Sequence, residues 1–153
     1  KRNKLEDNKT LLGDYITWDP IETYKISSQH GFKKLKKPLV GYYDYADIDD
    51  SFIMSIHHWL KWYKFGFTRS WDNLSLEIRY GRITREQALK KLYKIGNEYP
   101  IKEIKLFCKY TGISLKDFNL IANRFRNKQI WSKKNNKWII DNFILEKWQW
   151  NEI

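Results

Sequence analysis

Three consecutive helices are predicted by one stretch of the chain, FIMSIHHWLKWYKFGFTRSWDNLSLEIRYGRITREQALKKLYKIG, residues 52–96. Its first part repeats apolar residues at the three- and four-residue spacing of a helix, which predicts a helix from Ser51 to Phe65. Asp49 and Asp50 stand where side chains cap a helix start, and Gly66 ends the apolar pattern.

Two further helices are predicted in the same stretch. The first runs from Arg69 to Tyr80 and is stopped by Gly81. The second runs from Thr84 to Gly96, and it begins with a capping box in which the side chains of Thr84 and Gln87 satisfy each other's free amides.

The C-terminal part predicts two more helices and a hairpin. The helices cover Ile101 to Tyr110 and Leu115 to Arg126, with Ser114 as N-cap of the later one. Residues 130–150 place four tryptophans around an Asn-Asn pair at 135–136, which favours a hairpin or an extended tail laid over the helices.

The N-terminal part is more polar. Residues 1–13 are expected to be a linker or frayed end, and a short β-favouring run follows from Leu11 to Trp18. A helix is predicted from Ile21 to His30. The expected fold class is therefore mainly α, a compact helical domain over residues 14–153 with short β elements at both ends.

Composition limits the class of protein. The 153 residues are 42% hydrophobic and 17% aromatic, which excludes a wholly disordered chain, and no apolar run is long enough for a membrane span. The formal net charge is +11, but residues 1–50 carry nine basic and nine acidic groups, so the whole excess lies beyond them. Such an excess attracts polyanions, although it can also reflect a Lys-rich composition without functional meaning.

Several kinds of site find no support. The seven glycines are scattered and no two are adjacent, so neither a P-loop nor a dinucleotide fingerprint exists. His57 and His58 are neighbours that point about 100° apart on a helix, so no metal site is expected, and one of the pair is expected to be a buried, hydrogen-bonded histidine. The single Cys108 lies among apolar residues and is expected to be a structural thiol.

The basic residues of the central stretch are the best candidates for a site. Five of them surround two predicted helix starts: Lys64, Arg69, Arg79, Arg82 and Arg85. Guanidinium groups beside free helix amides suit a phosphate or carboxylate ligand. The competing interpretation is a salt-bridged helical surface, because Asp72, Glu77 and Glu86 are near enough to pair with some of these groups.

A nucleic-acid-binding module is the rival class. Residues 101–126 have the outline of a helix–turn–helix, with basic residues after it. The later helix offers Lys116, Asp117, Asn119 and Asn123, a mixed face with few base-reading groups, so nucleic acid is the less favoured partner.

The central blocks HHWLKWYKFGFTR (57–69) and EIRYGRITRE (77–86) resemble the N-acetyl sugar amidotransferase family of surface-glycan biosynthesis. The resemblance covers about residues 14–140, from Trp18-Asp19 and Gly41-Tyr42-Tyr43 to the segment FCKYTGIS at 107–114 and Trp138.

The resemblance implies a larger enzyme of the ATP-pyrophosphatase (PP-loop) type. In such enzymes ATP and Mg²⁺ activate the oxygen of a sugar's N-acetyl group, and ammonia from a glutaminase subunit displaces it to give an acetamidino group. The chain has no Ser-Gly-Gly loop for ATP and no initiator Met, so we expect the C-terminal portion of a cytoplasmic enzyme, inactive alone. A structural domain that docks the glutaminase is the remaining alternative.

The predicted substrate is an anionic sugar or nucleotide sugar. Its phosphate or carboxylate is expected to contact the basic residues named above, with His57 and His58 as secondary polar contacts. No catalytic residue is predicted.

Overall fold

The computed structural model describes residues 10–50 and 52–150. The chain forms two compact units, residues 1–34 and 35–153, and each is described by itself. The predicted linker over residues 1–13 falls largely on residues 1–9, outside those described.

The first unit holds a 3₁₀ turn, η1 (Leu12–Asp14), and one helix, α1 (Pro20–Gln29). The helix predicted from Ile21 to His30 is thereby confirmed, and Asp19 Oδ1 caps it by accepting a hydrogen bond from the amide of Ile21 at 2.9 Å. The β element predicted from Leu11 to Trp18 is wrong, because the segment forms η1 and irregular backbone. A strand needs a partner for its backbone hydrogen bonds, and no described segment pairs with this one.

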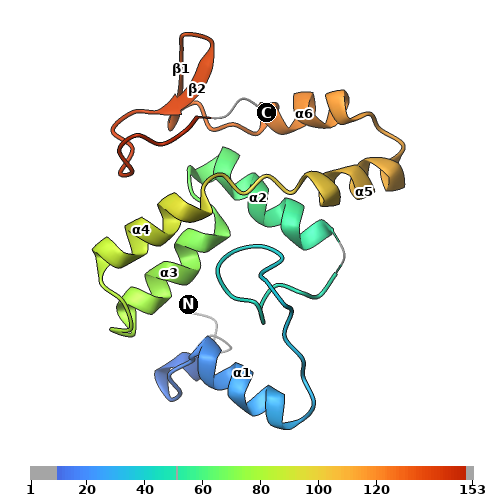
Figure 1. Ribbon diagram of the computed structural model, residues 1–153. Helices are drawn as coiled ribbons and strands as arrows, with labels where there is room; N and C mark the ends of the chain where they lie inside the picture. The colour runs from blue at the N-terminus through green and yellow to red at the C-terminus, as the bar shows by residue number, and fades with distance from the viewer. Residues whose placement is uncertain (1–9, 51, 151–153) are drawn as a thin grey trace, which may run out of the picture. The chain divides into compact units, whose positions relative to one another are not determined.

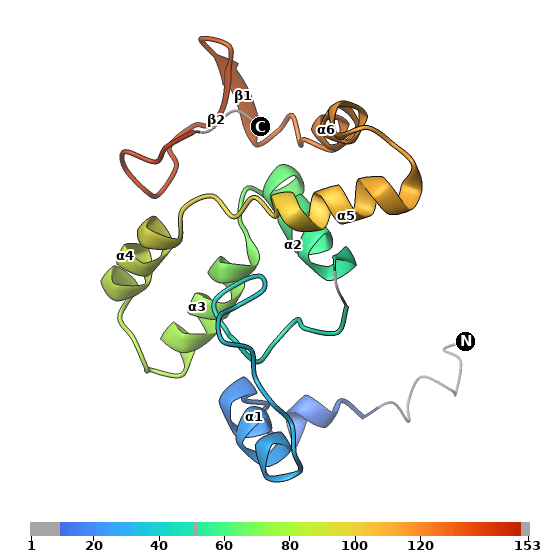
Figure 2. The same ribbon diagram turned by 45° about the vertical axis from the view of Figure 1, so that its right-hand side comes forward.

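The second unit is mainly α, as predicted. Its elements are α2 (Ile53–Phe65), α3 (Arg69–Arg79), α4 (Arg85–Ile95), α5 (Ile101–Thr111), α6 (Leu115–Arg124), β1 (Trp131–Lys134) and β2 (Lys137–Ile140). Helix α2 packs against α3, α5 and α6, while α3 with α4 and α5 with α6 form two helical hairpins (Figures 1 and 2). The sheet has two strands, so the helices carry the architecture.

The capping side chains predicted at the helix starts are confirmed. The Asp50 carboxylate accepts hydrogen bonds from the amides of Phe52 at 2.7 Å and Met54 at 3.0 Å, so it caps α2 even though the first described helical residue is Ile53. Ser51, the predicted first residue, lies outside the described residues. The capping box of Thr84 with Gln87 and the Ser114 cap are both present.

The core of the second unit is built on the aromatic residues of α2. Trp59 and Tyr63 are each 1% exposed. The Trp59 ring lies 4.8 Å from the Tyr63 ring, 5.4 Å from Tyr99 and 5.9 Å from Phe118, centroid to centroid. One side chain of α2 therefore joins the α4–α5 connection and α6 into a single apolar cluster. Cys108 is buried, and burial raises the pKa of its thiol, as expected of a structural cysteine.

The predicted hairpin is confirmed and lies over the end of α2. Strands β1 and β2 are antiparallel, with Trp131 opposite Ile140 and Lys134 opposite Lys137. The indole nitrogen of Trp131 donates a hydrogen bond to the carbonyl oxygen of Tyr63 at 3.0 Å. The chain then returns through residues 141–150, and the Trp148 ring lies 5.9 Å from the Trp62 ring.

The turn of this hairpin holds two left-handed asparagines, Asn135 with φ 48° and Asn136 with φ 64°. Two consecutive positive φ angles match the type I′ turn, in which glycine fits the second position best. Asn136→Gly is therefore expected to raise the free energy of unfolding by about 0.5–1 kcal/mol. Urea denaturation measures this, with Ser132→Gly in β1 as the control that is expected to lower stability. Equal effects of the two substitutions would contradict the assigned turn.

Candidate functional site

The seven predicted site residues come from α2, α3, the α3–α4 connection and the start of α4. His58 is buried, Arg69 and Arg82 are half-buried, and the other four are exposed: His57, Lys64, Arg79 and Arg85. Arg69 and Arg79 stand at opposite ends of α3, which separates their backbones by about 15 Å at the rise of an α-helix. The structure therefore does not bring all seven into one pocket.

Arg69 and His58 converge on Asp47, a residue of the loop before α2. Arg69 donates to Asp47 Oδ2 from Nε at 2.8 Å and to Oδ1 from Nη2 at 3.2 Å. His58 Nε2 lies 3.2 Å from the same Oδ1. Burial acts to raise the pKa of Asp47, but the hydrogen bonds from His58 and Arg69 outweigh it and lower the pKa to about 2. The carboxylate is therefore ionised at neutral pH, and it neutralises the Arg69 guanidinium.

A second carboxylate, on Asp72, extends this cluster. Its Oδ2 lies 3.5 Å from Arg69 Nη1 and forms an ion pair with Lys61. Arg69 thus faces two acids from two elements, and this part of the predicted salt-bridged surface is confirmed.

Glu77 forms the next cluster along α3. It is 6% exposed, and its Oε1 accepts a hydrogen bond from the Tyr43 hydroxyl at 2.5 Å and from Arg82 Nη1 at 3.0 Å. Burial, together with the hydrogen bond and the charge of Glu77, raises the pKa of Tyr43 well above its usual range. Tyr43 therefore stays a protonated donor, and the Arg82 charge is compensated within the protein.

Two backbone amides of the loop complete its attachment, one to α3 and one to the α4–α5 connection. The amide of Tyr42 donates to Asn73 Oδ1 at 2.9 Å, and the amide of Gly41 donates to Glu98 Oε1 at 3.0 Å. The same Glu98 oxygen accepts a hydrogen bond from Ser70 Oγ at 2.9 Å. We call the set the loop–helix network: Gly41, Tyr42, Tyr43, Asp47, His58, Arg69, Ser70, Asp72, Asn73, Glu77, Arg82 and Glu98.

Gly41 is the tightest point of the loop–helix network. Its φ is +79°, and a Cβ added there would lie 2.5 Å from Asn73 Oδ1 and 2.8 Å from Arg69 Cγ. Gly41→Ala is therefore expected to lower the free energy of unfolding by about 2 kcal/mol, because it adds a clash to an unfavourable φ. Gly112→Ala is the control, since Gly112 has φ +73° with nothing within 4 Å of an added Cβ. If chemical denaturation gives the same loss for both, the close approach at Gly41 is disproved.

The sequence motifs missed four members of the network. Asp47, Ser70, Asn73 and Glu98 were not singled out, although Asp47 belongs to the acidic run that contains the helix-capping Asp50. An acidic run that precedes a basic helix could have indicated that Asp47 pairs with a basic residue. Ser70, Asn73 and Glu98 carried no signal, because their contacts with one another and with the loop amides form only in the folded chain.

The exposed site candidates lie outside the loop–helix network. Lys64 lies over the Phe125 ring, 5.3 Å from its centroid, on the side of α2 that faces α6. Arg79 ends α3 and Arg85 begins α4, so both are near the connection between these helices. These two guanidinium groups, like Lys64 and His57, are exposed to solvent.

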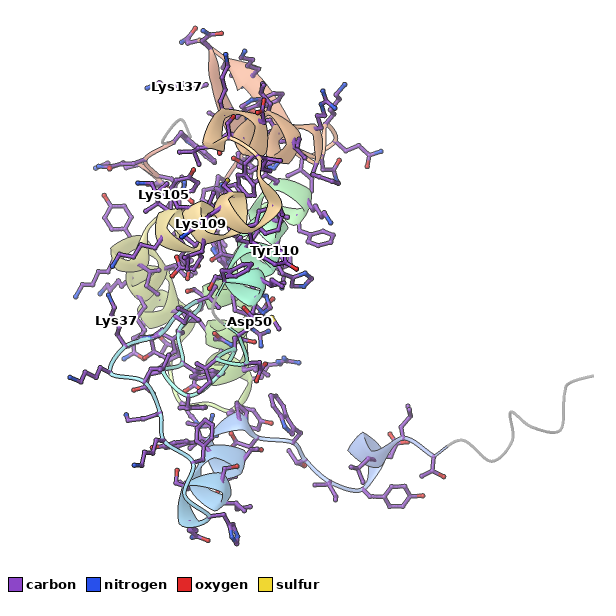
Figure 3. All side chains as sticks on the ribbon, turned by 90° about the vertical axis from the view of Figure 1, so that its right-hand side faces the viewer. Lys37, Asp50, Lys105, Lys109, Tyr110 and Lys137 are labelled. Atoms are coloured by element: carbon purple, nitrogen blue, oxygen red, sulfur yellow. The ribbon has the colours of Figure 1, made fainter. Side chains whose placement is uncertain are left out.

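The remaining basic charge is widely spread. Figure 3 shows the labelled lysines projecting from three parts of the second unit: Lys37 from the loop, Lys105 and Lys109 from α5, and Lys137 from the hairpin. Over residues 10–50 and 52–150, no group of three or more His, Cys, Asp and Glu is placed to hold a metal ion. In the same residues no helix has the length and apolar character needed to cross a membrane.

A family model, the C-terminal domain of LPS biosynthesis protein WbpG-like proteins, matches residues 31–144. This is most of the chain, and it contains the whole loop–helix network. The chain belongs to this family. No protein matched in a comparison with curated proteins.

The WbpG-like match begins near the division between the two units, so the second unit is the family domain. Helix α1 lies outside the match, and the resemblance expected from residue 14 is supported from residue 31. Both sequence blocks that carried the resemblance, 57–69 and 77–86, contribute residues to the loop–helix network.

Proposed function

We propose that this chain is the C-terminal part of an ATP-dependent sugar amidotransferase of lipopolysaccharide biosynthesis. The enzyme would convert an N-acetyl group of a sugar or nucleotide sugar into an acetamidino group with ammonia from a glutaminase partner. The observation that carries the proposal is the WbpG-like match over residues 31–144, which includes the blocks that resemble sugar amidotransferases. This domain would bind the anionic sugar substrate.

ATP and Mg²⁺ are assigned to a part of the enzyme outside this chain. The chain's glycines are scattered and none adjoins another, so its residues do not fit a phosphate-binding loop for ATP. In the described residues, glycines at positions 66, 96 and 112 follow helix ends, where they serve as caps. The contribution of this domain is therefore to bind and orient the sugar.

The basic residues divide into those paired with acids of the protein and those exposed to solvent. Arg69 and His58 hold the loop through Asp47, and Arg82 is paired with Glu77 of α3. Arg79 at the end of α3 and Arg85 at the start of α4 have exposed side chains, and Lys64 and His57 are exposed on α2. We assign the substrate's phosphate or carboxylate first to Arg79 and Arg85, because a charge already paired with a buried carboxylate has less to offer a ligand.

Replacing both arginines in the longer enzyme tests the assignment. Arg79→Ala with Arg85→Ala is expected to lower kcat/KM for the sugar substrate by about tenfold, chiefly through KM, since each removes a charge-assisted contact. The control is Lys90→Ala with Lys94→Ala, which removes the same charge from exposed positions of α4. Equal kinetics for the two double variants, both folded, would assign the arginines to the protein surface alone.

A further inference from the structure

A second concave site lies where the hairpin, the end of α6 and the C-terminal segment meet the end of α2. It is a pocket of about 190 Å³, here called the tryptophan pocket. Five of the chain's eight tryptophans line it: Trp62, Trp131, Trp138, Trp148 and Trp150. At about 30 Å³ for each water molecule, the pocket has room for roughly six waters, or for one small ring. None of its lining residues is among the seven site residues predicted from the sequence.

Arg126 is an unusual cation at the wall of this pocket. Its guanidinium carbon lies 4.0 Å from the centroid of the Tyr63 ring, 4.4 Å from Trp131 and 5.1 Å from Trp138. Nη2 donates to Asn123 Oδ1 at 3.1 Å, while Nε is buried and has no hydrogen-bond partner among the described residues. Aromatic faces compensate part of the cost of burying a cation, but they do not replace an anion.

The rest of the lining is polar without being acidic. Lys133 supplies a second cation, and Asn97, Asn123 and Asn136 supply amides. None of the described residues that line the pocket is Asp or Glu. Two further lining residues carry a buried polar atom without a partner, Asn97 at Oδ1 and Trp148 at Nε1. These two atoms are enclosed by protein, so the polar groups that a ligand can reach are the remaining amide groups and the two cations.

These features select one class of ligand. Indole faces accept the apolar C–H face of a saturated ring, and amides pair with hydroxyl groups, which both donate and accept hydrogen bonds. Arginine and lysine without a protein acid favour a carboxylate or phosphate. We propose that the tryptophan pocket binds one anionic monosaccharide, with its ring against the tryptophans and its carboxylate or phosphate on Arg126 and Lys133. This goes beyond the proposed function, because the pocket is separate from Arg79 and Arg85.

Titration of the 153-residue chain tests the proposal, followed by calorimetry and by tryptophan fluorescence. The probes are glucuronate, glucose 1-phosphate, glucose and inorganic phosphate. Saturable binding is expected for glucuronate or glucose 1-phosphate, and the stronger of the two shows whether the pocket prefers a carboxylate or a phosphate. Glucose and inorganic phosphate are each expected to bind at least about tenfold more weakly, because each lacks one half of the ligand. Absence of saturable binding for both anionic sugars, or equal binding of inorganic phosphate, would overturn the proposal.

Neighbouring lysines of β1 provide a matched pair of variants. Adjacent strand residues point to opposite faces, so Lys133 lines the pocket while Lys134 forms an ion pair with Asp141. Lys133→Ala is expected to weaken binding of the anionic sugar by about tenfold, and Lys134→Ala to change it by less than about twofold. Both positions are exposed, so both variants are expected to fold. Equal affinities in the two variants would also overturn the assignment.

Lysines outside the pocket separate this proposal from general charge attraction. Lys105→Ala with Lys109→Ala is expected to leave sugar binding by the chain within about twofold of wild type, since neither residue lines the pocket. Loss of binding in that double variant would show that the anionic sugar follows the net charge of the surface and would overturn the pocket. Binding that depends on Lys133 supports the pocket whether or not the longer enzyme proves to be an amidotransferase.

Discussion

Trp59→Ala is expected to lower the free energy of unfolding by about 3–5 kcal/mol, the largest effect of any single substitution considered. Trp59 is 1% exposed, and its ring contacts come from Tyr63 in its own helix, from Tyr99 and from Phe118 in α6. Truncation to alanine would leave a cavity at the point where these elements meet. Urea denaturation followed by circular dichroism measures the loss.

Trp18→Ala provides the control for that measurement. Trp18 is 59% exposed and belongs to the first unit, so its removal is expected to cost about 1 kcal/mol or less. A loss at Trp59 no larger than that at Trp18 would show that Trp59 is not the centre of the core.

Asp47→Asn is expected to lower the free energy of unfolding by about 3 kcal/mol at pH 7. The Asp47 side chain is 13% exposed, and it is the acid shared by Arg69 and His58. The amide of asparagine keeps the size of the side chain but removes its charge, so Arg69 would lose one of its two acids. The measurement is again the free energy of unfolding, compared with wild type.

The pH dependence of this difference tests its cause. Because the pKa of Asp47 is lowered from 3.8 to about 2 in the folded chain, the stability that it contributes is complete above about pH 4. That contribution, worth about 2 kcal/mol, is lost as the pH falls through 2. The difference between wild type and Asp47→Asn is therefore expected to shrink from about 3 to about 1 kcal/mol between pH 4 and pH 2. A difference that stays constant over this range would contradict the ion pairing of Asp47.

The helices could be predicted from sequence because each carries its own local signals. The Thr84–Gln87 capping box and Gly66 act within a few residues of the helix ends that they define, and both occur in the structure as expected. The strand expected at Leu11 to Trp18 failed for the opposite reason. Local propensity cannot supply a partner strand, and Tyr15 and Ile16 are 77% and 57% exposed.

The candidate site was only partly predictable. The sequence located the basic block and allowed for salt bridges, and Arg82 with Glu77, five residues apart, shows such a pair. It could not show that Arg69 pairs with Asp47, which lies 22 positions upstream, because that contact depends on how the loop folds. The tryptophan pocket could not be predicted from the sequence either, because α2, α6 and the hairpin each contribute part of its wall and meet only in the folded chain.

A calorimetric titration of the 153-residue chain tests most directly whether its basic charge serves a sugar substrate. The ligands are UDP-N-acetylglucosamine and a short DNA duplex, each at about 50 mM and 200 mM salt. We expect saturable binding of the nucleotide sugar and only weak DNA binding at the higher salt concentration. Tight, strongly salt-dependent DNA binding with no heat from the nucleotide sugar would contradict it and assign the domain to nucleic acid.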